Sequence, residues 1–340
     1  MGYQEQISAC TMMQNETNQP LASLCITCYN QAAYIRESIQ SAFDQTYSPL
    51  EIIICDDNST DGTDIIVEDM VNEYRHSCGR HKIVFRRNEK NLFVAKNYEQ
   101  AFRLANGHIR ITGAGDDISL PNRVARIVEL FNRGESEGKN VSCLLHGWFC
   151  VNASGKQIGS CKPWDIKTPL GAAAAYRDDV FSSFIPMAGE CHFYEDDLFS
   201  LRAFAIGDVL MVNEPLIKYR IDDGLSHAGS RRCARAKMSK AVLDACTYFS
   251  CELLAVRDKL QPERYSNVKE LLDWKKRHYE VEFKVCQGRF VWQRAWAFRK
   301  MNLNSGWNRS EQLRHFLFVL PSCLESIIRV VLRIKRKIAL

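Results

Sequence analysis

The chain has 340 residues, of which 46% are hydrophobic and 25% charged, so it can bury a large core and is neither disordered nor fibrous in composition. The formal net charge of +5 combines two unlike parts. From Gly229 onward there are 24 Lys and Arg against 10 Asp and Glu, a net charge of +14, which leaves −9 for the first 228 residues. We therefore expect an acidic catalytic part followed by a basic part that contacts an anionic partner.

Membrane spans and disulfides are not expected. No stretch of about 18 uncharged apolar residues occurs, and residues 1–19 are polar, which predicts a flexible leader without a secretory signal. Cys25 and Cys28 have the spacing of half a metal or redox motif. They lack a second pair at zinc-site spacing, which favours small buried thiols within a strand. We expect a reducing, cytoplasmic location.

Strands and helices alternate in the first part of the chain. We expect strands at 21–28, 51–55, 82–86 and 108–112, and helices at 33–45, about 65–74, 94–105 and 121–133. The nearly continuous apolar run at 51–55 is typical of a parallel strand covered on both faces. Asn106-Gly107 predicts a left-handed end to the third helix. This alternation predicts a mainly parallel α/β sheet.

The pattern changes after residue 133. We expect a hairpin of 141–151 with 156–160, a small helix within 171–180, a helix opened by Glu195–Asp197 and a strand at 208–220. From Cys233 to the end we expect helices, with breaks near Pro262, Gly288, Asn304–Gly306 and Pro321. The predicted domains are a catalytic domain over 20–228, divided into 20–120 and 121–228, and a basic helical region over 229–340.

Polar clusters follow three successive strands, at Thr27–Asn30, Asp56–Asp61 and Asp116-Asp117. Ligands of parallel sheets bind beyond the carboxyl ends of the strands, so the clusters predict one site of nucleotide-binding type. Two carboxylates at the end of a buried strand suit a divalent cation and an anionic ligand. The alternative for Asp116 and Asp117 is a solvated turn, because Asp and Gly are ordinary turn residues.

The order of these motifs resembles that of the family 2 glycosyltransferases of GT-A fold. The resemblance covers about residues 21–225 and rests on the following segments: Thr27–Asn30, Ser41–Tyr47, Glu51–Thr63, Asn88–Asn97, Asn106-Gly107, Gly115–Pro121, Glu195-Asp196 with Arg202, and Tyr219-Arg220. It implies a Rossmann-like, mainly parallel sheet flanked by helices. It also implies transfer of a sugar from a nucleotide diphosphate sugar, with inversion at the anomeric carbon and assistance by Mn²⁺ or Mg²⁺.

The resemblance also implies roles for single residues. The donor-binding residues would be Thr27, Tyr29, Asn30, Asp57, Lys96 and Asp116. Among them, Tyr29 would lie against the base, Asp57 would accept a hydrogen bond from it, and Lys96 would lie near the diphosphate. Asp196 matches the general base that deprotonates the acceptor hydroxyl.

The chain departs from the family pattern at the metal site. Ala114 stands where the family has the first carboxylate of Asp-x-Asp, so the predicted metal ligands are Asp116 and Asp117. Asp117 either replaces the missing ligand or caps the helix near Pro121. Lys96 stands where the family usually has Arg. The compact charge of an ammonium group therefore replaces a planar guanidinium with its several donors.

Two carboxylates also have plain structural interpretations. Asp196 as a general base would contribute about 10² to 10⁴ in rate, whereas an acidic residue at a helix start can equally serve the helix dipole. Asp57 can read a base or simply cap a turn.

The basic tail over 313–340 contains an amphipathic pattern from Leu324 to Ile338. It predicts either an interfacial helix on an anionic membrane or a helix docked on the catalytic domain. No nucleic-acid motif is present. The expected partners are a nucleotide diphosphate sugar and a glycan or lipid-linked glycan acceptor, in the cytoplasm or peripherally on the inner face of the cell membrane.

Two other functions are alternatives to sugar transfer. A non-catalytic sugar-nucleotide-binding protein or partner subunit is compatible with Ala114, although Asp116 and Asp196 argue against it. A nucleotidyltransferase would need a Gly-rich phosphate loop after the first strand, and residues 27–31 contain none.

Overall fold

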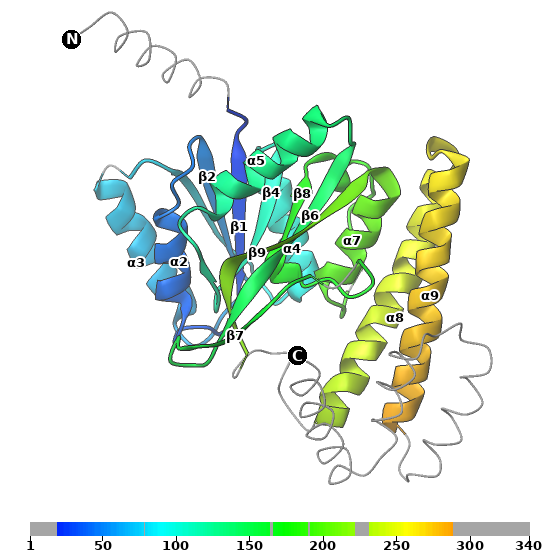
Figure 1. Cartoon of the computed structure of the whole chain (residues 1–340). Coiled ribbons are helices and arrows are strands. Elements are labelled where there is room, and N and C mark those ends of the chain that lie inside the picture. Colours follow the sequence, from blue (N-terminus) through cyan, green and yellow to red (C-terminus); the bar gives the residue numbers. More distant parts are fainter. Residues whose placement is uncertain (1–18, 78, 164–165, 190, 222–230, 288–340) are drawn as a thin grey trace, which may run out of the picture. The chain divides into compact units, whose positions relative to one another are not determined.

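The computed structural model describes residues 19–77, 79–163, 166–189, 191–221 and 231–287 (Figure 1). Its contacts divide the chain into two units. The first unit comprises Met1–Gly224 with Tyr248–Val268, and the second comprises Leu225–Thr247 with Lys269–Leu340. The leader over 1–19 and the domain limits at 228 and 229 stay predictions, and the breaks predicted after residue 287 and the tail over 313–340 lie outside the described residues.

Within the described residues, nine strands form one sheet in the first unit, in the order β3-β2-β1-β4-β8-β6-β9-β5, with β7 beside β6. The strands are β1 (Ala22–Cys28), β2 (Leu50–Asp56), β3 (Lys82–Arg87), β4 (Ile109–Ala114), β5 (Ile118–Ser119), β6 (Val141–Val151), β7 (Gln157–Cys161), β8 (Ala174–Arg177) and β9 (Asp208–Arg220). Strands β1 to β4 pair with one another in parallel, as predicted, so their carboxyl ends lie at the same edge of the sheet.

Helices cover both faces of this sheet (Figure 1). They are α2 (Ile35–Phe43), α3 (Thr63–His76), α4 (Val94–Leu104), α5 (Arg123–Ser136), the short α6 (Asp179–Ser182) and α7 (Glu195–Ile206). Alternate residues of β1 point to opposite faces. Leu24 and Ile26 join the apolar core formed with α2, α3 and α5, whereas the thiol of Cys25 contacts the carbonyl of Ala101 on α4.

Residues 174–177 form strand β8 between β4 and β6, so the predicted small helix within 171–180 is wrong over these residues. Only Gly171–Ala173, a 3₁₀ turn, and α6 are helical there. The segment is a short Ala-rich run without alternation, and Ala favours helix. Pairing with two neighbouring strands overrides that preference.

Gly107 does not end α4 in a left-handed conformation, which corrects a second prediction. The helix ends at Leu104, and Ala105 is already extended, with φ −75° and ψ 138°. Gly107 is instead a close-approach position. Its N–H donates to the hydroxyl of Ser23 at 2.8 Å, and a Cβ at this residue would lie 2.6 Å from the backbone nitrogen of Ser23.

Gly107→Ala is therefore expected to lower the free energy of unfolding by about 1–3 kcal/mol, because added volume must displace backbone atoms of β1. Urea denaturation measures this. Gly159→Ala on β7 is the control, since its Cβ would meet only the Cβ of Cys150 at an ordinary 4.0 Å. Equal effects of the two substitutions would contradict the close approach.

Two long helices follow the sheet, α8 (Arg231–Val256) and α9 (Pro262–Gln287), with a 3₁₀ turn at Arg257–Lys259 between them. The break near Pro262 was predicted. Parts of both helices belong to the first unit, where Glu252 pairs with Arg202 and Arg264 pairs with Asp208. In the second unit, Arg235 pairs with Glu282. Among the described residues, no helix has the length and apolar character needed to cross a bilayer.

Candidate active site

The three polar clusters lie together at the carboxyl edge of β2, β1 and β4. Thr27 on β1 stands beside Cys55 on one side and Ala114 on the other. Backbone bonds connect the segments that follow, since the N–H of Gly115 donates to the carbonyl of Thr27 at 3.0 Å and that of Asp57 donates to the carbonyl of Cys28 at 2.9 Å. The structure thus brings the predicted donor-binding residues of the first strands to one place.

Tyr29 and Asn30 form the loop after β1. Tyr29 is half-buried, and Asn30 is exposed with a φ of 51°. The side-chain oxygen of Asn30 accepts from the N–H of Thr60 at 2.8 Å, and the Asn30 N–H donates to the Ser59 hydroxyl at 2.9 Å. Asn30 therefore ties the β1 loop to the β2 loop.

Asp57 holds the segment that leads into α4. Its Oδ1 accepts from the side-chain amide of Asn88 at 2.9 Å and from the N–H of Leu92 at 2.8 Å. Asp57 is 3% exposed, and burial raises the pKa of its carboxyl, against the lowering effect of these hydrogen bonds. Asp57 thus lies at the carboxyl edge of the sheet. Its hydrogen bond to the base of the donor nucleotide stays a prediction.

Asp116 and Asp117 form the turn between β4 and β5. Oδ1 of Asp117 accepts from the N–H of Arg220 at 3.0 Å, whereas its Oδ2 is buried and has no hydrogen-bond partner among the described residues. Burial raises the pKa of both carboxyls, and Asp116 raises that of Asp117 further. Because α5 begins only at Arg123, after Asn122 as its N-cap, Asp117 does not cap that helix.

Arg220, at the end of β9, holds this turn from the side. The residue is 2% exposed. Its Nε donates to the carbonyl of Asp116 at 2.9 Å, and its two terminal nitrogens donate to Ala153 O in the β6–β7 loop and to Glu37 on α2, each at 2.7 Å. Its guanidinium also lies 4.4 Å from the ring centre of Tyr34. Tyr219-Arg220 is one of the segments on which the family resemblance rests. The sequence does not indicate, however, that Arg220 bonds the Asp116-Asp117 turn, the β6–β7 loop and α2 together, an arrangement that we call the Arg220 clamp.

These carboxylates suit a hard divalent cation. Among the described residues, no group of three or more His, Cys, Asp and Glu side chains is placed to hold a metal. Mg²⁺ and Mn²⁺, however, commonly bind through one or two carboxylates together with substrate phosphates. The unpartnered Oδ2 of Asp117 beside Asp116 is compatible with such an ion.

Lys96 links the donor side of the site to the segment before α7. Its Nζ donates to the carbonyl of Gly189 at 2.6 Å. Lys96 lies in the first turn of α4, whereas Gly189 is seven residues before Asp196 in the chain. The contact therefore connects the predicted diphosphate residue with the segment that leads to the predicted base.

Asp196 and Glu195 begin α7, where they lie against Gly171 of the 3₁₀ turn that follows residue 170. Asp196 is half-buried, and its Oδ1 accepts from the N–H of Asp197 at 3.0 Å. Glu195 is 6% exposed. Gly171 fits against both, since a Cβ there would lie 2.2 Å from an oxygen of Glu195 and 3.2 Å from the Cβ of Asp196. Thr112 on β4 bonds the carbonyl of Gly171 at 2.6 Å and so fixes this contact.

Glu195 belongs to the motif Glu195-Asp196, but the sequence assigns it no chemical role of its own. Burial, with a smaller contribution from Asp197, raises the pKa of Glu195 to about 7 from an ordinary 4.5. The folded state therefore binds its proton more tightly than the unfolded state does. This contribution to stability is complete below about pH 4.5 and is lost as the pH rises through about 7.

Glu195→Gln is expected to remove that loss, because Gln resembles the protonated acid. Between about pH 5 and pH 8, ionisation of Glu195 lowers the free energy of unfolding of the parent chain. In the variant this decrease should be smaller, by up to about 3 kcal/mol. Denaturation curves across this pH range measure the difference. Glu68→Gln, exposed on α3, should leave the pH dependence unchanged. Parallel curves for Glu195→Gln and the parent would contradict the raised pKa.

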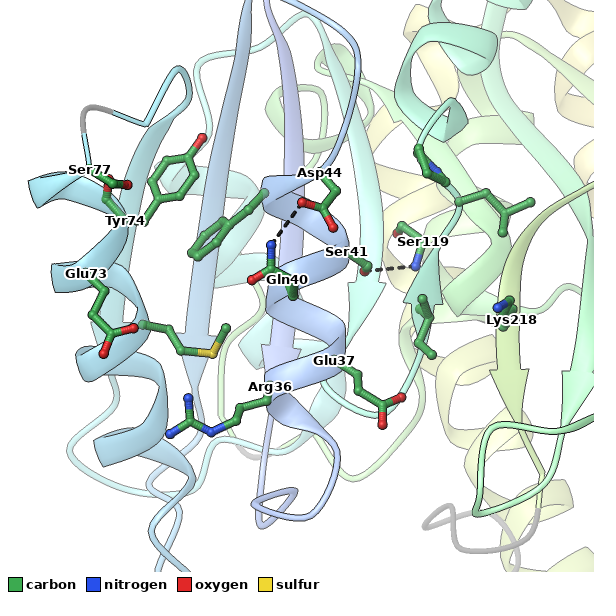
Figure 2. A pocket seen from close by; sticks show the side chains of 15 residues that line it. Arg36, Glu37, Gln40, Ser41, Asp44, Glu73, Tyr74, Ser77, Ser119 and Lys218 are labelled. Carbon is green, nitrogen blue, oxygen red and sulfur yellow. Dashed lines mark hydrogen bonds between the residues drawn. The ribbon is translucent and has the colours of Figure 1, made fainter.

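A groove of about 870 Å³ lies elsewhere, between α2, α3 and β5 (Figure 2). Figure 2 shows the Gln40–Asp44 and Ser41–Ser119 hydrogen bonds along its wall. None of the predicted site residues lines this groove. The predicted donor-binding residues that follow β1, β2 and β4 lie instead at the carboxyl edge of the sheet.

Known proteins are similar to this chain in sequence and in fold. Residues 23–182 match the family model described as glycosyl transferase family 2. An uncharacterized glycosyltransferase of Nostoc, alr2836, is 23% identical over 64% of this chain and 70% of its own length. An uncharacterized glycosyltransferase of Methanocaldococcus jannaschii, MJ1057, is 29% identical over 46% of this chain and 51% of its own length. Chondroitin synthase of Escherichia coli is 27% identical over 54% of this chain, but the match spans only 23% of that enzyme.

Two solved structures share the fold. TarS 1–349 of S. aureus, in complex with UDP-GlcNAc, aligns with a TM-score of 0.55 at 15% identity, over 88% of this chain and 90% of that one. The mannosyltransferase PcManGT of Pyrobaculum calidifontis, in complex with GDP-Man and Mn²⁺, aligns with a TM-score of 0.54 at 14% identity, over 89% and 87%. These values confirm the predicted fold class. Residues 23–182 thus form a glycosyl transferase family 2 domain, and the chain has the GT-A fold.

Proposed function

We propose that the chain transfers a sugar from a nucleotide diphosphate sugar to an acceptor hydroxyl, with inversion at the anomeric carbon. The observation that carries this proposal is the 2.6 Å contact between Lys96 and the carbonyl of Gly189. It joins the helix beside Asp57 and the Asp116-Asp117 turn to the segment that ends at Asp196. The contact supports one site that has a side for an anionic donor and a side with a base.

On the donor side, the loops after β1 and β2 bind the nucleoside, with the Tyr29 ring against the base and Asp57 as an acceptor. Lys96 supplies positive charge near the diphosphate, which gains negative charge as the bond to the sugar breaks. The ligands in the TarS and PcManGT complexes, UDP-GlcNAc and GDP-Man, support a nucleotide sugar as the donor.

On the acceptor side, Asp196 accepts the proton of the attacking hydroxyl. A sugar hydroxyl is a weak nucleophile until a base takes its proton, and the half-buried carboxylate of Asp196 at the start of α7 supports this role. A single displacement brings the hydroxyl in opposite the leaving diphosphate, which inverts the anomeric carbon.

Asp116 and Asp117 would hold Mn²⁺ or Mg²⁺, which would act as a Lewis acid on the diphosphate. The Mn²⁺ in the PcManGT complex supports a divalent ion in this fold. Arg220 keeps the turn in place by bonding the Asp116 carbonyl and the Asp117 carboxylate from one residue.

The proposed acceptor is a glycan or lipid-linked glycan in polysaccharide synthesis. Chondroitin synthase and the abequosyltransferase RfbV of Salmonella typhimurium, 36% identical over 29% of each chain, are relatives that support a glycan acceptor. A peripheral position on the inner face of the cell membrane, through the basic tail, is part of the same proposal.

A thermal-shift screen of nucleotide sugars, with and without Mn²⁺, tests the donor side without a known acceptor. A ligand at a hundred times its dissociation constant stabilises the folded state by about 2.7 kcal/mol. We expect at least one nucleotide diphosphate sugar to raise the melting temperature, and Mn²⁺ to increase that shift. No shift with any nucleotide would contradict the proposal. Donor binding without turnover on any acceptor would instead favour the non-catalytic sugar-nucleotide binder.

A further inference from the structure

Phe93 has a backbone conformation that its side chain disfavours. It is the N-cap of α4, with φ 66° and ψ 160°. This region is essentially accessible only to Gly, and a residue held there costs on the order of 1–3 kcal/mol. The neighbouring bonds fix it, because the Leu92 N–H donates to Asp57 and the Phe93 N–H donates to Oδ1 of Asn91, each at 2.8 Å.

Packing inside the protein does not account for this conformation. Phe93 is 42% exposed, so its ring gains only part of the free energy that burial of a Phe side chain provides. The ring contacts that of His192, with centroids 4.1 Å apart and planes at 70°. His192 is itself exposed. The Phe93–His192 pair thus lies at the surface although the backbone conformation of Phe93 is strained.

The pair stands where the two sides of the site meet. Phe93 follows Leu92, which bonds Asp57, and precedes Lys96 by three residues. His192 follows Gly189, the partner of Lys96, by three residues and precedes Asp196 by four. The contact between the two rings therefore joins the segment that carries Lys96 to the segment that leads to Asp196, as the Lys96–Gly189 hydrogen bond also does.

We infer that Phe93 and His192 form a contact surface for a pyranose ring in the transfer reaction. The C–H face of a pyranose packs on an aromatic ring, and the imidazole of His192 can hydrogen-bond a sugar hydroxyl. The inference rests on the proposed function and deepens it, because it assigns sugar recognition to two residues outside the predicted donor set. The pyranose is that of the donor or that of the acceptor, and the experiment separates the two.

The test uses Phe93→Gly, Phe93→Tyr and His192→Ala in the full chain. Without ligand, Phe93→Gly is expected to be at least as stable as the parent, since Gly relieves the strain. Affinities are measured for a nucleoside diphosphate and for the matching nucleotide sugar, together with KM for the acceptor. Phe93→Tyr keeps the ring and should behave as the parent does.

If the donor sugar lies on the pair, Phe93→Gly and His192→Ala bind the nucleotide sugar about tenfold more weakly and the nucleoside diphosphate unchanged. If the acceptor sugar lies there, both affinities are retained and KM for the acceptor rises about tenfold. Ile65→Ala, exposed on α3, should alter none of these values.

Unchanged sugar affinity and unchanged acceptor KM in both variants overturn the inference. So does an equal loss of nucleoside diphosphate and nucleotide sugar affinity, since that would show a purely structural role for the loop. These outcomes leave the proposed function standing, because the parent chain still binds and transfers. A parent chain that binds no nucleotide at all removes the proposed function and this inference with it.

Discussion

Asp196→Asn is expected to lower the turnover number of sugar transfer by about 10² to 10⁴ while leaving donor affinity unchanged. Asn keeps the size of the side chain and can still accept from the N–H of Asp197, but it cannot take the proton of the acceptor hydroxyl. Turnover is measured with a donor found by the thermal-shift screen, and donor affinity is measured by titration.

Asp69→Asn, exposed on α3, is the matched control and should keep parent turnover. Glu195→Gln is the informative neighbour, because it changes the adjacent acid without removing the proposed base. Asp196→Asn with parent turnover would exclude Asp196 as the base. A larger loss in Glu195→Gln than in Asp196→Asn would transfer that role to Glu195.

Glu252→Ala is expected to lower the free energy of unfolding by about 3 kcal/mol, because it leaves a buried guanidinium with a weaker set of partners. Arg202 on α7 has 0% exposure of its side chain. Its Nε donates to Glu252 on α8 at 2.9 Å, and Nη1 reaches Glu99 on α4 at 3.4 Å. Urea denaturation measures the loss.

Arg264→Ala provides the comparison, since Arg264 pairs with Asp208 across surfaces that are 30% and 39% exposed. A pair of this kind contributes about 0–1 kcal/mol. The Arg202 cluster also holds the segment before Asp196, because Arg202 bonds the carbonyl of Ile185 and Glu99 accepts from the N–H of Met187 at 2.8 Å. Equal destabilisation by the two substitutions would contradict the buried cluster.

Much of the sheet was predictable because its signals are local. The apolar run predicted at 51–55 is strand Leu50–Asp56, and the hairpin predicted around residues 152–155 joins β6 to β7. Parallel pairing alone was enough to predict that the clusters after β1, β2 and β4 share an edge. Local patterns specify these elements since each depends on its own residues and on the connection that follows.

The rest depended on partners distant in the sequence. Strand β8 exists because β4 and β6 lie on either side of it, and Gly107 is needed because β1 lies against it. The acidity of Glu195 depends on burial, which an acidic run at a helix start does not indicate. Glu252 reaches Arg202 across 50 residues, from a helix beyond the region that matches the family.

The clamp formed by Arg220 has a consequence for the order in which the protein folds. Arg220 bonds Asp116 across 104 residues and Glu37 across 183 residues. Contacts so distant in the sequence form slowly, because long loops must close first. During synthesis, the Asp116-Asp117 turn therefore leaves the ribosome long before the residue that holds it. We expect the Asp116-Asp117 turn to become ordered late in folding, although every predicted site residue except Asp196 lies within the first 117 positions.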